Sequence, residues 1–146
     1  MVAPLYYDTS VLTALALRDD GWSACAAVVA SQPGDLLISD FGWGEFVSAL
    51  GARVRTRQLR RLTAAHLADQ AYADLLDSAP VPIVSADVTA ATEALGDFEL
   101  ALKLPDAIHI AVARRLKATL LSTDRQQVAA ARSLGPACIN PLQETP

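Results

Sequence analysis

The feature that most constrains the fold of this chain is an alternation of short apolar runs with longer alanine-rich segments. Each apolar run has three or four residues. The runs are LYY (5–7), LLIS (36–39), PIVS (82–85), TLLS (119–122) and ACIN (137–140). The first four do not alternate between apolar and polar residues, which is typical of strands that are covered on both faces.

The segments between these runs carry apolar residues at spacings of three and four, which predicts helices. They cover residues 11–17, 22–30, 41–54, 62–79, 87–103 and 105–116, and a further helix is expected after LLSTD. Strands that alternate with helices indicate an α/β fold, with a mostly parallel central sheet of about five strands and helices on both faces. The two helices between the second and third strands are expected to form an antiparallel hairpin that turns near Arg55–Gln58.

The 146 residues fit a single domain, 1–146, with a loose tail expected over about 141–146. No apolar run approaches the roughly 20 residues that span a bilayer, and the N-terminus does not resemble a signal peptide, so a cytoplasmic location without membrane contact is expected. Cys25 and Cys138 lie far apart in apolar surroundings and are expected to be buried. The net charge of −4 argues against coating nucleic acid by bulk charge, but it allows a local basic patch.

The apolar runs stop at a hydroxyl or an acid, in YYDTS, LLISDF, PIVSAD and LLSTD. Because parallel strands share one direction, these endings meet at the edge where open α/β folds bind ligands. For any one of these residues, helix capping worth about 1 kcal/mol is the better explanation, and we interpret Asp40 as a cap. Glu45 lies too far inside its helix to act as one.

Asp106 follows Pro105 in the first turn of its helix, where it either complements the helix dipole or projects toward Asp8. If Asp8, Glu45, Asp106 and Asp124 converge, their like charges require a positive partner. Oxygen ligands suit a hard cation, Mg²⁺ or Mn²⁺, and the natural substrate group for such a site is a phosphate.

Four motifs occur in order along the chain: D-T-S after the first strand, S-D-x-x-x-x-E, L-P-D-A-I-H-I-A and L-L-S-T-D. Together they resemble the PIN-domain ribonucleases, and most closely the VapC toxins of VapBC toxin-antitoxin modules. The resemblance runs from Leu5 to about Pro141 and implies a three-layer PIN-like fold.

The resemblance also implies an Mg²⁺- or Mn²⁺-dependent endoribonuclease toxin that cleaves tRNA or rRNA with a metal-activated water. Asp8, Glu45, Asp106 and Asp124 would be its catalytic, metal-holding residues. Thr9, Ser10 and Thr123 would orient these ligands or contact phosphate. The implied partners are a VapB-type antitoxin that neutralises the toxin and a second copy of the chain in a homodimer.

Two further groups of residues have open interpretations. His109 either orients the carboxylate of Asp106 or is a satisfied core or interface histidine, and we favour the second; His66 is expected at the surface or an interface. The run GARVRTRQLRR either contacts RNA phosphates or forms a solvated face, with equal weight. Its arginines are Arg53, Arg55, Arg57, Arg60 and Arg61.

The sequence disfavours two other functions. A receiver-like phosphoacceptor signalling domain would need a pair of acids after the first strand, whereas YYDTS has one. A non-catalytic RNA-binding PIN scaffold is disfavoured because all four acidic positions are occupied.

Overall fold

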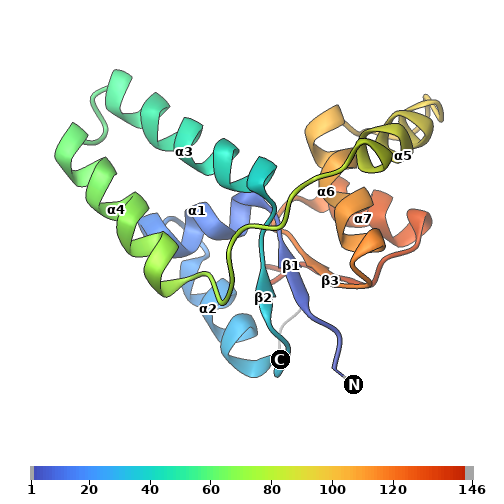
Figure 1. Ribbon diagram of the computed structural model, residues 1–146, viewed down its shortest axis with the longest axis horizontal. Coiled ribbons are helices and arrows are strands. Elements are labelled where there is room, and N and C mark those ends of the chain that lie inside the picture. The colour runs from blue at the N-terminus through green and yellow to red at the C-terminus, as the bar shows by residue number, and fades with distance from the viewer. Residues whose placement is uncertain (1, 144–146) are drawn as a thin grey trace.

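The computed structural model describes residues 2–143, whose strands form one parallel sheet in the order β2-β1-β3-β4. Figure 1 shows the first three side by side. The strands are β1 (Leu5–Tyr7), β2 (Leu36–Leu37), β3 (Thr119–Leu121) and β4 (Cys138–Ile139). In the central strand β1, Leu5 pairs with both Leu36 and Thr119. All four strands therefore end at one edge of the sheet.

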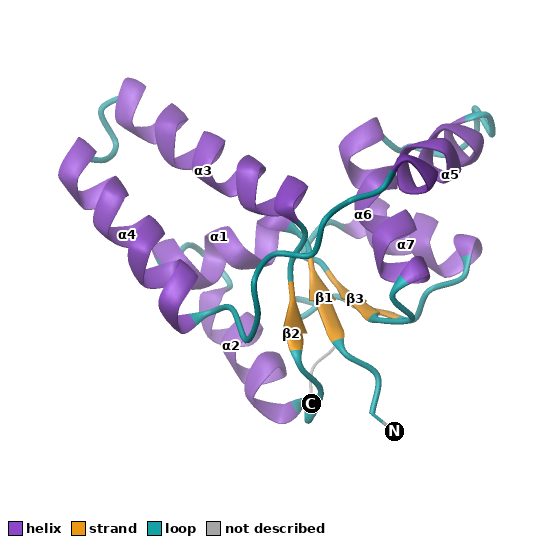
Figure 2. Ribbon diagram, in the orientation of Figure 1, coloured by secondary structure: helices purple, strands orange, loops and turns teal. Residues whose placement is uncertain are grey.

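Helices cover both faces of this sheet (Figure 2). They are α1 (Thr9–Leu17), α2 (Trp22–Ser31), α3 (Asp40–Arg55), α4 (Arg61–Asp74), α5 (Ser85–Leu95), α6 (Leu104–Arg115) and α7 (Arg125–Leu134). The first four pack on one face and the last three on the other. The α/β class is confirmed, and α3 and α4 form the expected hairpin.

Alternate side chains of the central strands enter opposite cores, as the period of two in a strand requires. Tyr6 and Leu120 pack into the core under α5–α7, whereas Tyr7 and Leu121 pack into the core under α1–α4. All four are fully buried. This burial on both faces explains why the strand sequences are continuously apolar.

The expected strand at residues 82–85 is wrong. Only Val81 pairs with the sheet, in an isolated parallel bridge to Ser39 beside β2. Pro80 and Pro82 flank it and lack the N–H groups that a longer ladder would need. The sheet of the described residues therefore has four strands.

Two helices end earlier than the periodicity predicts. The segment expected to be helical over 87–103 stops at Leu95, where Gly96 and Asp97 interrupt it, and the one expected over 62–79 stops at Asp74. An ion pair joins α5 to α6, because Arg115 donates to the buried carboxylate of Asp87 at 2.9 and 3.0 Å.

The tail is more ordered than expected as far as the structure describes it. The backbone N–H groups of Leu142 and Gln143 donate to the side chain and carbonyl of Asn140, respectively; residues 144–146 of the expected loose tail lie outside the described range. Cys25 is buried as predicted, whereas Cys138 is only half-buried. No helix within residues 2–143 has the length and apolar character to cross a membrane.

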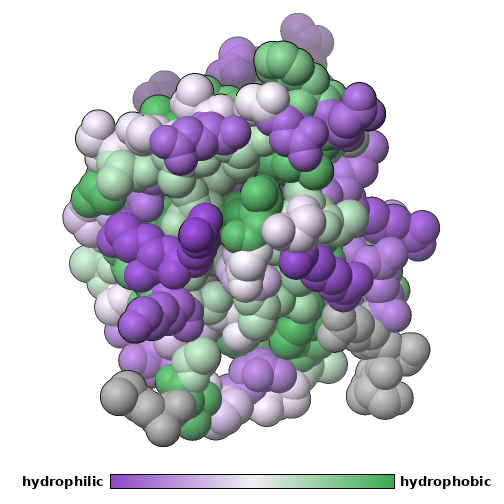
Figure 3. Space-filling model, turned by 90° about the vertical axis from the view of Figure 1, so that its right-hand side faces the viewer, coloured by the Kyte–Doolittle hydropathy of each residue, from purple (hydrophilic) through white to green (hydrophobic). Residues whose placement is uncertain are grey.

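The face formed by α5, α6 and α7 exposes apolar side chains between charged ones (Figure 3). Val88 on α5, Leu104 on α6 and Phe98 in the loop between them are exposed. A cleft between α5 and α6 has a floor of small residues that includes Ala90 and Ala111.

Candidate active site at the ends of the strands

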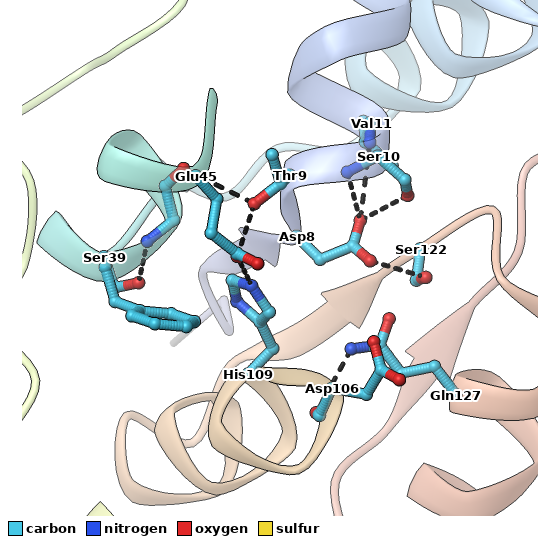
Figure 4. A network of polar contacts seen from close by, with 12 residues as sticks. Asp8, Thr9, Ser10, Val11, Ser39, Glu45, Asp106, His109, Ser122 and Gln127 are labelled. Atoms are coloured by element: carbon cyan, nitrogen blue, oxygen red, sulfur yellow. Dashed lines mark hydrogen bonds and ion pairs between the residues drawn. The ribbon is translucent and has the colours of Figure 1, made fainter. Parts of the chain in front are cut away.

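Asp8 follows β1 directly and is buried at the N-terminus of α1. Its Oδ1 accepts hydrogen bonds from the backbone N–H and hydroxyl of Ser10 and from the N–H of Val11, and its Oδ2 accepts one from the Ser122 hydroxyl at 2.9 Å (Figure 4). Burial raises the pKa of Asp8, although the nearby His109 and the two serines oppose this shift. Asp8 therefore both caps α1 and lies in the candidate site.

Glu45 lies one turn inside α3, where its Oε1 accepts hydrogen bonds from Thr9 at 2.8 Å and from Nε2 of His109 at 2.5 Å. Burial opposes ionisation of this carboxyl, but the hydrogen bonds from His109 and Thr9 outweigh it and lower the pKa of Glu45. The disfavoured alternative, in which His109 orients the carboxylate of Asp106, is wrong, because its ring nitrogens lie against Glu45 and Tyr6. Its satisfied, buried state agrees with the favoured interpretation.

A buried chain of hydrogen bonds continues from His109 to the start of α3. The Nδ1 of His109 lies 2.7 Å from the hydroxyl of Tyr6, and that hydroxyl donates to Ser39 Oγ at 2.8 Å. Ser39 also caps α3 by accepting from the N–H of Gly42. The chain thus links β1, α3 and α6, which are the elements that carry or precede Asp8, Glu45 and Asp106.

Asp106 and Asp124 complete the acidic edge. Asp106 is half-buried, and its carboxylate accepts one long hydrogen bond, from the N–H of Lys103 at 3.4 Å. Its pKa is raised first by burial and further by the negative charges of Asp124 and Glu45, against the Lys103 hydrogen bond and His109. Asp124 caps α7 and is exposed.

Two site residues were missed by the sequence analysis. Ser122 contacts Asp8 with its hydroxyl, whereas the expected Thr123 contributes its backbone N–H to Ser10 Oγ at 3.3 Å. Gln127 is fully buried, with its Nε2 donating to the Asp106 carbonyl, and its Oε1 has no hydrogen-bond partner among the described residues. Gln127 is a polar residue at a buried position of α7, and this was the only feature that could have identified it as a site residue.

Asp40 was expected to cap α3, but Ser39 is the capping residue. Asp40 is the first residue of the helix, and its Oδ1 accepts from the N–H of Ile83 at 3.0 Å. It holds the segment after Val81 against the sheet and lies outside the acidic group.

The arginine run lies at the far end of the α3–α4 hairpin. Arg53 is committed to a bidentate ion pair with Asp19, at 2.6 and 3.0 Å. The others, Arg55, Arg57, Arg60 and Arg61, are exposed. Ten residues of helix separate Glu45 from Arg55, or about 15 Å along the axis, so the exposed arginines do not line the acidic edge itself.

The acidic edge suits a hard cation in the chemistry of its donors but is not a closed cage. All four donors are carboxylates, and the negative charges of Asp124 and Glu45 add to burial in raising the pKa of Asp106. Within residues 2–143, no three His, Cys, Asp or Glu side chains converge closely enough to enclose a metal. Mg²⁺ commonly takes one or two protein carboxylates and completes its shell with water and substrate phosphates.

The family model of the PIN domain matches residues 5–133, so the chain belongs to the PIN-domain family. This match covers every acidic residue of the site. It also excludes the receiver-like alternative. No curated protein is significantly similar in sequence.

Solved structures share this fold at low sequence identity. FitAcB from Neisseria gonorrhoeae is 16% identical, with 96% of this chain and 99% of that chain covered and a TM-score of 0.76. The sarcin-ricin loop cleaving toxin VapC20 from Mycobacterium tuberculosis is 23% identical, with coverage of 86% and 94% and a TM-score of 0.67. VapBC2 from Rickettsia felis, bound to a promoter DNA fragment, is 11% identical, with coverage of 93% and 97% and a TM-score of 0.66.

Proposed function

We propose that the protein is a metal-dependent endoribonuclease and the toxin of a toxin-antitoxin module. The observation that carries this proposal is the row of carboxylates at the strand ends: Asp8 and Asp124 cap the helices that follow β1 and β3, and the negative charges of Asp124 and Glu45 add to burial in raising the pKa of Asp106. PIN-family membership and the resemblance to a sarcin-ricin loop cleaving toxin support RNA as the substrate.

Asp8, Asp106 and Asp124 would hold Mg²⁺ or Mn²⁺, with Glu45 close by. When bound, such an ion activates water and polarises the phosphodiester. The chain's own residues fix the geometry: Ser10 and Ser122 hold Asp8, while Thr9 and His109 hold Glu45. None of these roles requires a nucleophilic side chain.

An antitoxin is the proposed protein partner, because several similar structures are toxin-antitoxin complexes. A cationic side chain from such a partner would neutralise the same carboxylates that a metal ion does. We also propose a homodimer through the α5–α6 face, where Val88, Phe98 and Leu104 are exposed around the alanine-floored cleft. Light scattering at micromolar concentration should give twice the mass of the chain, and a monomer would contradict this assignment.

The nuclease proposal is tested by incubating the protein with total tRNA and with rRNA, and mapping any new 5′ ends. Cleavage should require Mg²⁺ or Mn²⁺ and should fall by at least about 100-fold in Asp8→Asn and Asp106→Asn, each with an unchanged circular dichroism spectrum. The matched control is Asp69→Asn on the exposed face of α4, which should cleave like the wild type. Cleavage by the wild type in excess EDTA would refute the metal requirement.

The scaffold alternative makes the opposite prediction. A non-catalytic RNA-binding domain would retain RNA without producing new ends at any metal concentration.

A further inference from the structure

The exposed face of α3 has an unusual composition for a helix surface. Residues 41, 45, 48, 52 and 55 follow one another at helical spacing, on the side away from the buried Gly42, Phe46 and Leu50. Phe41 and Glu45 are half-buried, and the other three are exposed. A shallow groove runs along this face and is open to solvent. It is lined by Phe41, Gly44, Glu45, Ser48, Ala49 and Ala52. The lining residues that follow Glu45 along the helix, Ser48, Ala49 and Ala52, have no side chain larger than that of serine.

Gly44 has no structural reason to be glycine. A Cβ built at this position would have nothing within 4 Å, whereas one at Gly42 would lie 3.0 Å from Ile38 and 3.2 Å from His109. Glycine is among the poorest helix formers, so an exposed glycine in the middle of a helix weakens it without a packing benefit. A second molecule whose backbone approaches the helix closely would account for the missing side chain.

The groove lies between an aromatic ring and a guanidinium group, two kinds of group that can bind nucleic acid. Phe41 lies at the acidic end, with its ring 5.5 Å from that of His109. At the other end, the guanidinium of Arg55 lies back over Gly51, since a Cβ at Gly51 would be 3.0 Å from Arg55 Nη1. Arg55 has no acidic partner in the described chain, unlike Arg53. Aromatic platforms and cationic groups along a groove are typical of single-strand binding.

We propose that this face of α3 is a track for the single-stranded segment of the RNA that enters the acidic site. Gly44 and Gly51 are seven residues apart, which is roughly 10 Å along the helix. An RNA strand that rises about 3.4 Å per nucleotide would span this distance with about three nucleotides. The backbone lies against the small residues, a base stacks near Phe41, and Arg55 binds a phosphate. This inference rests on the proposed function and adds the path of the substrate.

The test fills the groove without touching the acids. Gly44→Gln and Ser48→Gln place a longer side chain on the groove, and Ala65→Gln on the exposed face of α4 is the matched control. Binding of a fluorescently labelled 12-nucleotide single-stranded RNA is measured by anisotropy in EDTA, so that metal-dependent cleavage does not interfere. Both groove variants should bind about 10-fold more weakly, the control should bind like the wild type, and the melting temperature of Gly44→Gln should not fall.

Arg55→Gln supplies an independent measurement. It should weaken binding and reduce the slope of log affinity against log salt by about 0.7, the value for one phosphate contact on a single strand. Wild-type RNA affinity in both groove variants would overturn the inference, even if these variants lost binding to a protein partner. An equal loss in Ala65→Gln would also overturn it. Because binding is measured without cleavage, a failure of the nuclease proposal would remain distinguishable.

Discussion

The hydrogen bond between His109 and Glu45 is expected to couple the stabilities of α3 and α6, and a double-mutant cycle measures this directly. The cycle uses His109→Leu, which keeps an apolar side chain but no donor, together with Glu45→Ala and the double variant. A hydrogen bond to a charged group contributes about 1.5–3 kcal/mol. The Glu45 side chain is 31% exposed, so water partly replaces the lost bond, and we expect a coupling energy near the lower limit, about 1.5 kcal/mol.

The assay is urea unfolding at constant temperature in EDTA, so that no cation at the site contributes to the free energy of unfolding. The m-value should be the same in all four proteins. Effects that add to within about 0.5 kcal/mol would refute the reasoning, because residues that do not interact behave in that way.

The pH dependence gives a second check. The folded-state pKa of Glu45 lies below its ordinary value of 4.5, so its ionisation stabilises the folded protein. The coupling should therefore be complete above about pH 4.5 and should disappear as the pH falls through the lower, folded-state pKa. A coupling that grew on acidification would contradict the assignment of Glu45 as the charged acceptor.

Three further predictions concern stability. Asp8→Asn should be about 1 kcal/mol more stable than the wild type at pH 7. Burial raises the pKa of Asp8, so its negative charge destabilises the folded protein at any pH above the ordinary pKa of 3.8. The gain in stability should therefore vanish in acid, and a loss of stability at pH 7 would contradict this prediction. Arg115→Met should destabilise by about 3 kcal/mol in urea, since it leaves the Asp87 carboxylate buried and unpaired, and a change below 1 kcal/mol would be inconsistent with that pair. Gly44→Ala should stabilise the protein by up to about 1 kcal/mol, because alanine is the better helix former. Gly42→Ala should destabilise it by about 1–2 kcal/mol, because the new methyl group would lie 3.0 and 3.2 Å from other side chains. Thermal melts compare the two variants, and equal effects would refute the packing argument.

The order of strands and helices could be predicted because it depends on local patterns. Buried central strands are continuously apolar, and the hydroxyls and acids at their ends identify the edge where the site lies. The error at residues 82–85 has a local cause, since the apolar run was given more weight than the two prolines around Val81. Proline should have had the greater weight because it removes donors that a strand needs.

The partners of the site residues were harder to predict because they come from distant parts of the chain. Asp106 and His109 are three residues apart on one helix, which left an interaction between them open, yet His109 hydrogen-bonds to Glu45 on α3. Tyr6 was counted only as an apolar strand residue. A buried tyrosine hydroxyl needs a hydrogen-bond partner, and this requirement could have pointed to the network with His109 and Ser39.

The pairing of β1 also determines when the site can form during synthesis. Ser122 and Asp8, which share a hydrogen bond, are separated by 114 residues, and β3 is the neighbour of β1 on that side of the sheet. At 5–20 residues per second, a ribosome needs roughly 6–23 s to make Ser122 after Asp8. Throughout that interval the nascent chain contains YYDTS but lacks the strand that completes its surroundings. Under the proposed toxin function, this delay would give the proposed antitoxin time to bind the α1–α4 half before the acidic edge is assembled.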